Sequence, residues 1–317
     1  MKQLTLYFIC LAMMLGMTAC GSDEPDLDRQ RDVTVSCSLT HVLNTSTNES
    51  TLNTSNVNTV VVHQRALTAD FTLQATIDGA KRQFTVTGVP LKRVDYQDYR
   101  YTFNYDSASG DVKNLKGTVD VSDVALFISY DVEGHHVDTS IPDVFFAQTG
   151  VKFSYTDGTS TTAANSFWTL KVNDSANSAN LMINDLNIAR DSVDNVIFDD
   201  TGKRIVVPGR NGRFLTALMG RGAKVQPTPQ GFKVTGTQLE SVATFGDGDH
   251  VAGGSSRQTE DYIVREVALD VNMTTGRLDG TMVIRHVFKR DPDKNPLEWD
   301  DMNVQVSGET YKVSALN

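Results

Sequence analysis

Acidic residues and histidines gather in residues 131–138, where the chain reads Asp-Val-Glu-Gly-His-His-Val-Asp. Carboxylates and imidazoles are common metal ligands in proteins. His135 and His136 are adjacent, however, and adjacent residues on a strand point to opposite faces. We therefore interpret this segment as a charged turn rather than a metal site.

A second polar group, Asp247-Gly-Asp249-His250, lies in a stretch rich in Gly and Asp. Long loops on a rigid β scaffold often carry binding residues. Asp247, Asp249 and His250 are therefore candidate residues for binding a sugar or Ca²⁺. A solvated loop is the alternative.

Residues 291–295 begin like a calcium-binding loop, with the pattern Asp-x-Asp-x-Asn. Such a loop needs Gly at its sharp turn and Glu at its twelfth position, where this chain has Pro296 and Met302. A surface turn is the better interpretation. The sequence predicts neither a bound metal nor a cofactor.

The common enzyme motifs are missing from the sequence. It contains no Gly-x-Ser-x-Gly elbow, no phosphate-binding Gly-x-x-x-x-Gly-Lys-Ser/Thr loop, no Cys-x-x-Cys and no His-Glu-x-x-His. Paired carboxylates can hydrolyse glycosides, but among 39 acidic residues no pair stands out. We therefore predict no catalytic residues and lean towards a protein that is not an enzyme.

Aromatic and serine side chains supply the remaining candidates. Trp168 and Trp299 could form a platform for a ligand, since aromatic side chains commonly line binding sites; cross-strand packing is the alternative. Ser107, Ser175 and Ser192 each follow Asp and precede an apolar residue. These triplets resemble the O-glycosylation acceptor of Bacteroides-like bacteria, although Asp and Ser also favour ordinary turns.

Almost all of these residues are expected on β-strands or their turns, because apolar residues recur with period two and rarely with period 3.6. Asp78-Gly79 between two alternating runs predicts a hairpin. The best helix candidate is the short stretch 213–219. Many short strands with regular turns predict an all-β fold of two tandem antiparallel β-barrel or β-sandwich domains.

We predict four segments: a signal peptide over residues 1–19, a tether over 20–58, and two β-domains over 59–160 and 161–317. The tether is assigned because residues 40–58 are rich in Asn, Ser and Thr and have few apolar groups to bury. Residues 84–94 and 232–242 share the pattern Phe-x-Val-Thr-Gly-x-x-Leu-x-x-Val. This repeat suggests a duplicated domain, although strand and turn patterns also recur by chance.

The N-terminus carries the most specific motif. Lys2 precedes an apolar run over residues 4–16, which is shorter than the roughly 20 residues of a membrane-spanning helix and is typical of a signal peptide. The run ends in Met17-Thr-Ala-Cys20, which resembles the bacterial lipobox. The resemblance implies that the signal peptide is cleaved just before Cys20 and that Cys20 is lipidated.

Net charge limits the classes of partner to expect, and the cysteine count limits the possible disulfides. The net charge is −10, and phosphate binding needs clustered Lys and Arg, so nucleic acid is an unexpected partner. Of the three cysteines, Cys10 would leave with the signal and Cys20 would take lipid. This leaves Cys37, in an alternating run, as a core residue that cannot form an intrachain disulfide.

As a whole, the chain resembles Bacteroidota surface lipoproteins with tandem β-domains of calycin-like or fimbrillin-like type, since an acidic run at residues 23–26 follows the lipobox. The resemblance implies lipid anchoring at the outer membrane, with the protein exposed at the cell surface. We expect a non-catalytic protein that binds a glycan or a small apolar ligand. The alternatives are a structural or adhesive fimbrial-type subunit with a protein partner in the envelope and, less favoured, an outer-membrane hydrolase.

Overall fold

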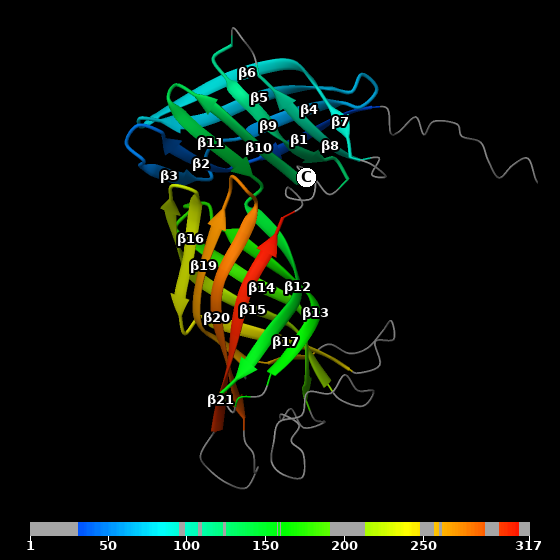
Figure 1. Ribbon diagram of the computed structural model, residues 1–317, viewed down its shortest axis with the longest axis vertical. Coiled ribbons are helices and arrows are strands. Elements are labelled where there is room, and N and C mark those ends of the chain that lie inside the picture. The colour runs from blue at the N-terminus through cyan, green and yellow to red at the C-terminus, as the bar shows by residue number, and fades with distance from the viewer. Residues whose placement is uncertain are drawn as a thin grey trace, which may run out of the picture.

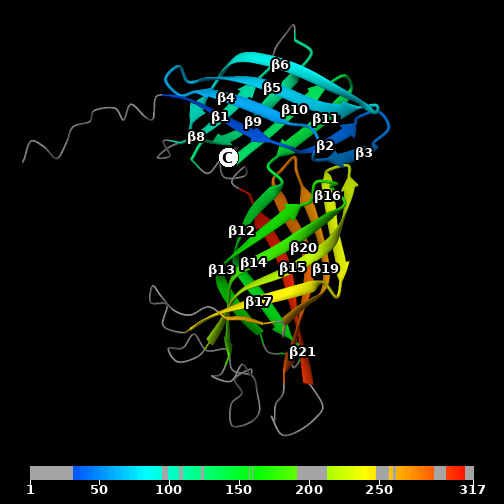
Figure 2. The same ribbon diagram turned by 180° about the vertical axis from the view of Figure 1, so that it is seen from behind.

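The computed structural model describes residues 31–94, 99–106, 110–122, 125–156, 158, 160–190, 213–247, 257–259, 262–288 and 298–310. Throughout these residues the chain forms antiparallel strands and turns, with no helix, which confirms the all-β prediction. Consequently no helix of this part is long and apolar enough to cross a membrane. The strands build two lobes that are stacked end to end (Figures 1 and 2).

The first lobe is a sandwich of two sheets. The four-stranded sheet has the order β1-β4-β5-β6 and consists of β1 (Asp32–Cys37), β4 (Asn58–His63), β5 (Thr68–Ile77) and β6 (Ala80–Pro90). The seven-stranded sheet has the order β3-β2-β11-β10-β9-β8-β7 and consists of β2 (Leu39–Asn44), β3 (Ser50–Asn53), β7 (Lys92–Arg93), β8 (Arg100–Tyr105), β9 (Lys113–Asp120), β10 (Ala125–Val132) and β11 (His135–Ser140).

Strand β5 shows how the sequence pattern builds the sandwich. Its residues alternate between buried and half-buried along the whole strand, as expected where one face of a sheet covers a core. The β5–β6 hairpin turns at Asp78 and Gly79, which have φ of 49° and 78°. Positive φ at both central residues is typical of a type I′ turn, so the predicted hairpin is confirmed.

The second lobe is an eight-stranded antiparallel barrel. Its strands are β12 (Asp143–Tyr155), β13 (Ser160–Val172), β14 (Ser178–Arg190), β15 (Arg213–Thr228), β16 (Gly231–Thr237), β19 (Tyr262–Asn272), β20 (Arg277–Phe288) and β21 (Glu298–Glu309). The pairing of β14 with β15 closes the barrel. β17 (Glu240–Asp247) and β18 (Arg257–Thr259) extend the sheet from β15.

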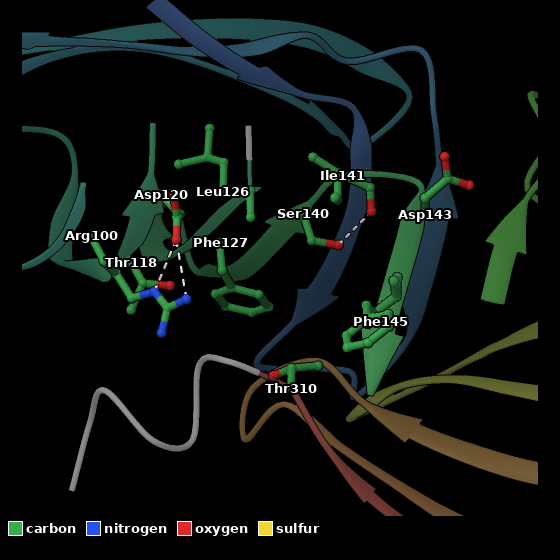
Figure 3. A pocket seen from close by; sticks show the side chains of 12 residues that line it. Arg100, Thr118, Asp120, Leu126, Phe127, Ser140, Ile141, Asp143, Phe145 and Thr310 are labelled. Carbon is green, nitrogen blue, oxygen red and sulfur yellow. Dashed lines mark hydrogen bonds and ion pairs between the residues drawn. The ribbon is translucent and has the colours of Figure 1, made fainter. Parts of the chain in front are cut away.

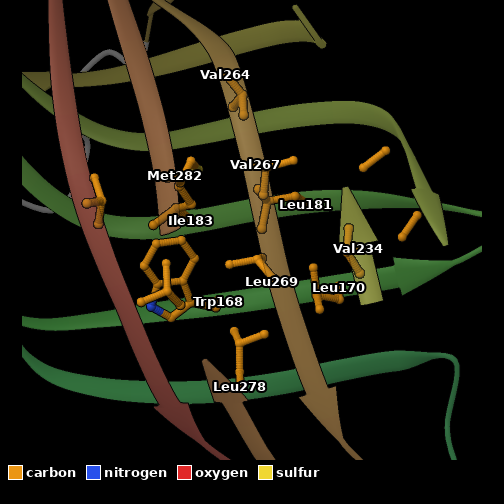
Figure 4. Close-up of a cluster of buried hydrophobic side chains, with 14 of the residues drawn as sticks. Trp168, Leu170, Leu181, Ile183, Val234, Val264, Val267, Leu269, Leu278 and Met282 are labelled. Carbon is orange, nitrogen blue, oxygen red and sulfur yellow. The ribbon is translucent and has the colours of Figure 1, made fainter. Parts of the chain in front are cut away.

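Apolar side chains from these strands meet inside the barrel (Figure 4). Trp168 of β13 is fully buried there, with Leu170 beside it and Leu269 and Met282 from the facing strands. Burial of such large side chains is the main favourable term in folding. The lobe is therefore stabilised by its own core.

The tether prediction is wrong for residues 32–53, which form β1, β2 and β3, and β4 already begins at Asn58. The polar side chains of this segment can be buried because they find partners. Asn58 donates through Nδ2 to the hydroxyls of Thr40 and Thr139 at 3.3 and 3.2 Å and accepts from the backbone N–H of Gln74 at 2.8 Å. Satisfied polar groups cost little to bury.

Two further predictions are corrected. Residues 213–219 belong to β15 rather than to a helix, because pairing with β14 on one edge and β17 on the other overrides a weak local preference.

The boundary between the lobes lies at Ile141 and Pro142, whereas the predicted boundary at residues 160 and 161 falls inside the β12–β13 hairpin. Strand-like alternation continues through both regions, so it did not mark the change of lobe.

The two copies of the repeated motif lie in different surroundings. β6, which holds the first copy, forms an edge of the sandwich, whereas β16 lies between β15 and β19 of the barrel. Phe84 is half-buried, whereas Phe232 is fully buried. The motif thus describes a strand and its turn, and duplication stays a prediction.

Candidate functional site

A cavity of about 360 Å³ lies where the sandwich meets the barrel (Figure 3). The sandwich contributes residues of β8, β9, β10 and β11, and the barrel contributes the start of β12 and Thr310 after β21. Small-ligand pockets commonly occupy about 300–1,000 Å³ and often lie between domains. The position and size of this cavity are therefore those of a binding site.

One wall of the cavity is polar. Arg100 and Asp120 are directly opposed on β8 and β9, and the Nε and Nη2 atoms of Arg100 both lie 3.1 Å from Oδ2 of Asp120. Both side chains are about one-tenth exposed. The Oδ1 atom of Asp120 accepts hydrogen bonds from the backbone N–H and the hydroxyl of Ser122 at 3.0 and 2.7 Å. The carboxylate is therefore fixed in place beside the cavity.

The opposite side is mainly apolar. Phe127 of β10 and Phe145 of β12 present their rings to the cavity, with Ile141 close by (Figure 3). Val144 also belongs to the lining. Phe145 also stacks on Phe167, with ring centroids 5.5 Å apart and an angle of 22° between the planes. This stack fixes one face of the Phe145 ring on the barrel.

Next to the cavity, a buried carboxylate joins the two lobes. Asp138 of β11 is fully buried and accepts hydrogen bonds from Ser129 at 2.5 Å and from Thr274 of the barrel at 2.8 Å. His136 Nε2 lies 3.3 Å from the same carboxylate. A second link joins His41 Nε2 of the sandwich to the carbonyl oxygen of Thr228 of the barrel, 2.7 Å away. These two contacts, Asp138 with Thr274 and His41 with Thr228, are called the joint between the lobes below.

Electrostatics explains how this carboxylate can be buried. The hydrogen bond with Asp138, together with the charges of Asp138 and Asp131, raises the pKa of His136 to about 9 against the opposing effect of burial. His136 is thus charged at neutral pH and balances Asp138. Burial lowers the pKa of His41, so that this second histidine stays neutral.

Ser129, His136 and Asp131 resemble a Ser-His-Asp triad in outline. Ser129 Oγ lies 3.3 Å from His136 Nε2, and His136 Nδ1 lies 2.5 Å from Asp131 Oδ1. The serine is fully buried, however, and its hydroxyl donates to Asp138. A nucleophile must reach its substrate and give its proton to the histidine, so this cluster supports the joint rather than catalysis.

The segment 131–138 is therefore more than a charged turn, because it forms the β10–β11 hairpin that carries the joint. His135 lies on the other face of the strand from His136, as expected, with its Nδ1 atom 2.9 Å from the carbonyl oxygen of Glu133. Within the described part of the chain no cluster of His, Cys, Asp and Glu could hold a metal ion.

The other predicted site residues do not meet at the cavity. Trp168 is inside the barrel core, and Asp247 and Trp299 lie on β17 and β21. Ser175 is exposed in the turn after β13, where modification stays a prediction. Outside the described residues lie the following predicted site residues: Cys20, Ser107, Ser192, Asp249 and His250.

The chain matches no protein-family model, no curated protein and no solved structure.

Sequence reasoning missed the residues that line the cavity, among them Arg100, Asp120, Phe127 and Phe145. Arg100 begins β8 and Asp120 ends β9, and the two form a cross-strand pair; opposite charges at such positions attract. That pair could have been suspected from the sequence, once the β8–β9 hairpin was assumed. The approach of Phe127 to Phe145 has no signal in the sequence, because it depends on how the lobes meet.

Proposed function

We propose that this protein is a lipid-anchored component of the outer cell envelope, exposed at the surface, that binds a small ligand without transforming it. The single observation that carries the proposal is the cavity between the lobes, which combines an apolar side with a fixed polar wall. Such a combination is typical of ligand sites, where apolar groups supply affinity and a few polar groups set orientation.

Binding is preferred over hydrolysis because of the state of the two carboxylates at the cavity. Glycoside hydrolysis needs one protonated and one ionised carboxyl group. Asp120 is held by Arg100 at 3.1 Å, and a neighbouring guanidinium favours the ionised form. Asp143 is the other carboxylate that lines the cavity, half-exposed and 3.7 Å from Lys171. Both carboxylates therefore already have a cationic partner within the protein.

Native mass spectrometry of the full-length protein, purified in detergent from its own host, tests the proposal. We expect a small molecule bound at fixed stoichiometry and lost in the Phe145→Ala variant. The matched control is Phe84→Ala, since Phe84 is a half-buried phenylalanine of the sandwich that lies away from the cavity. Equal ligand occupancy in both variants, or no ligand in the wild type, would overturn the proposal.

A structural or adhesive role is the second candidate, and one observation favours it. β1 lies at an edge of the four-stranded sheet and pairs only with β4 among the described strands. Open sheet edges allow strand donation between subunits. Native gels of purified protein would then show a ladder of assembled species, whereas a discrete monomer would count against this role.

A further inference from the structure

We infer that the interlobe cavity takes a neutral pyranose sugar, held as the terminal unit of a glycan. This inference rests on the proposed function, because it names the ligand class of the same cavity. It chooses between the two ligand classes, glycan and apolar molecule, that the sequence left open.

Charge is the first argument. The cavity is lined by one guanidinium, that of Arg100, and by two carboxylates, those of Asp120 and Asp143. Because Arg100 already forms a buried ion pair with Asp120, it does not supply a net positive charge. Asp143 is likewise paired, with Lys171 at 3.7 Å. An anionic ligand such as a fatty acid would therefore find, among the described residues that line the cavity, no cation that lacks a carboxylate partner to balance its charge. A neutral ligand fits this lining better than an anion.

The distribution of polar groups is the second argument. Figure 3 shows Arg100, Thr118 and Asp120 on one side of the cavity and Phe145 on the other, with Phe127 between them, and it places Thr310 and Asp143 near Phe145. The cavity thus offers aromatic rings together with polar groups on both sides, and a pyranose has a matching character, with C–H groups on its faces and hydroxyls around its edge. Its C–H face matches a phenyl ring, and its hydroxyls match a carboxylate and a guanidinium, which supply strong acceptors and donors.

An unsatisfied hydroxyl is the third argument. Thr310 Oγ1 is buried and has no hydrogen-bond partner among the described residues, although it lies in the cavity wall. Buried polar atoms are almost always hydrogen-bonded in native proteins. A ligand hydroxyl would satisfy Thr310, whereas a purely apolar ligand would leave it without a partner.

The test is isothermal titration of the full-length protein with an array-selected neutral glycan, with the matching glycan that ends in a uronic acid, and with palmitate. We expect the neutral glycan to bind one to one and the two anions to bind at least tenfold more weakly. Phe145→Leu, which keeps an apolar side chain but removes the aromatic face, should weaken the neutral glycan about tenfold. Thr310→Val should have a similar effect, and the matched control Thr235→Val, on the outside of the barrel, should have none.

The outcomes separate the two proposals. Cavity-dependent binding of palmitate or of the acidic glycan would overturn the sugar inference and leave the proposed function standing. Neutral binding that is unchanged in Phe145→Leu and Thr310→Val would overturn the assignment to this cavity. Absence of binding by every probe would overturn the sugar inference alone, because the proposed function is tested separately by native mass spectrometry of the protein from its host. Thermal melting of each variant identifies any loss of fold, and Thr310→Val keeps the shape of the side chain, so at least one variant stays interpretable.

Discussion

Asp138 of the sandwich accepts a hydrogen bond from Thr274 of the barrel, with the two side-chain oxygens 2.8 Å apart. The chain from Thr274 leads to Gly276, whose carbonyl oxygen accepts a hydrogen bond from the backbone N–H of Thr310 at 2.8 Å. Thr310 lines the cavity. The joint between the lobes is thus connected to the candidate binding site by one short turn.

Removal of the Asp138 carboxylate is expected to destabilise the joint. Asp138→Ala leaves Ser129 and Thr274 without their acceptor in a buried place and takes from charged His136 one of its two carboxylate partners, since Asp131 remains. Loss of hydrogen bonds to a buried charged group costs about 1.5–3 kcal/mol each, so we expect a loss of about 3 kcal/mol. Urea denaturation followed by circular dichroism measures this loss. Thr274→Val, which removes one neutral donor, should cost only about 1 kcal/mol; equal costs for the two variants would contradict the central role of Asp138.

Stability is expected to fall at alkaline pH. The pKa of His136 is raised from 6.5 to about 9, so its contribution is fully present below pH 6.5 and is lost as the pH rises through 9. We expect a loss of about 2 kcal/mol, because a change of one in a pKa is worth about 1.4 kcal/mol and the imidazole keeps some contact with solvent. The lowered pKa of His41 reduces the stability of the fold only as the pH falls below 6.5, outside this range.

Denaturation curves between pH 7 and 10 check this prediction, with His136→Gln expected to flatten the dependence. The matched control is His63→Gln. The pKa of His63 is also raised, first by its hydrogen bond with Asp70 and then by that with Asp32, but His63 is half-buried and both of its carboxylate partners are exposed, whereas Asp138 is fully buried, so we expect a smaller effect. A slope that His136→Gln leaves unchanged would rule out His136 as its source.

Truncation of the barrel core should affect one lobe. Trp168→Ala removes the largest fully buried side chain, and such a cavity costs about 3–5 kcal/mol. In differential scanning calorimetry, the barrel transition should shift down while the sandwich transition is retained. Phe71→Ala, in the sandwich core, should lower the sandwich transition and leave the barrel transition in place. If both transitions shift together in each variant, the lobes unfold as one unit.

Gly117 is expected to tolerate no side chain. A Cβ at this position would lie 2.0 Å from the carbonyl oxygen of Phe127 and 2.7 Å from the ring of Phe103. Gly117→Ala should therefore destabilise the sandwich by about 1–3 kcal/mol and also weaken ligand binding, because Phe127 lines the cavity. Gly79→Asn is the control, since no atom lies within 4 Å there and Asn accepts positive φ. A melting temperature unchanged in Gly117→Ala would contradict the close contact.

Cys37 should be unreactive in the folded protein. Burial raises the pKa of its thiol to about 12, and the thiolate is the reactive form. Iodoacetamide at pH 8 should leave Cys37 unmodified until urea is added, as peptide mass mapping would show. Rapid alkylation without denaturant would mean that the sandwich opens at β1.

The sequence by itself determined the local structure. Period-two alternation identified strands such as β5, and Asp78-Gly79 identified the hairpin after it, because both signals arise within a few neighbouring residues. It also indicated a core position for Cys37, which is confirmed. The polar stretch at residues 40–58 wrongly predicted a tether, because the burial of its amides depends on partners such as Thr139, far along the chain.

Only the tertiary structure decided the closure of the barrel and the candidate site. The closing pair, β14 and β15, is separated by a long segment, and the joint brings together Asp138 and Thr274, 136 residues apart in sequence. The cavity has the same origin, since Phe127 and Phe145 belong to different lobes. Sequence periodicity describes which face of a strand is buried, but the contacts between lobes depend on the path of the whole chain.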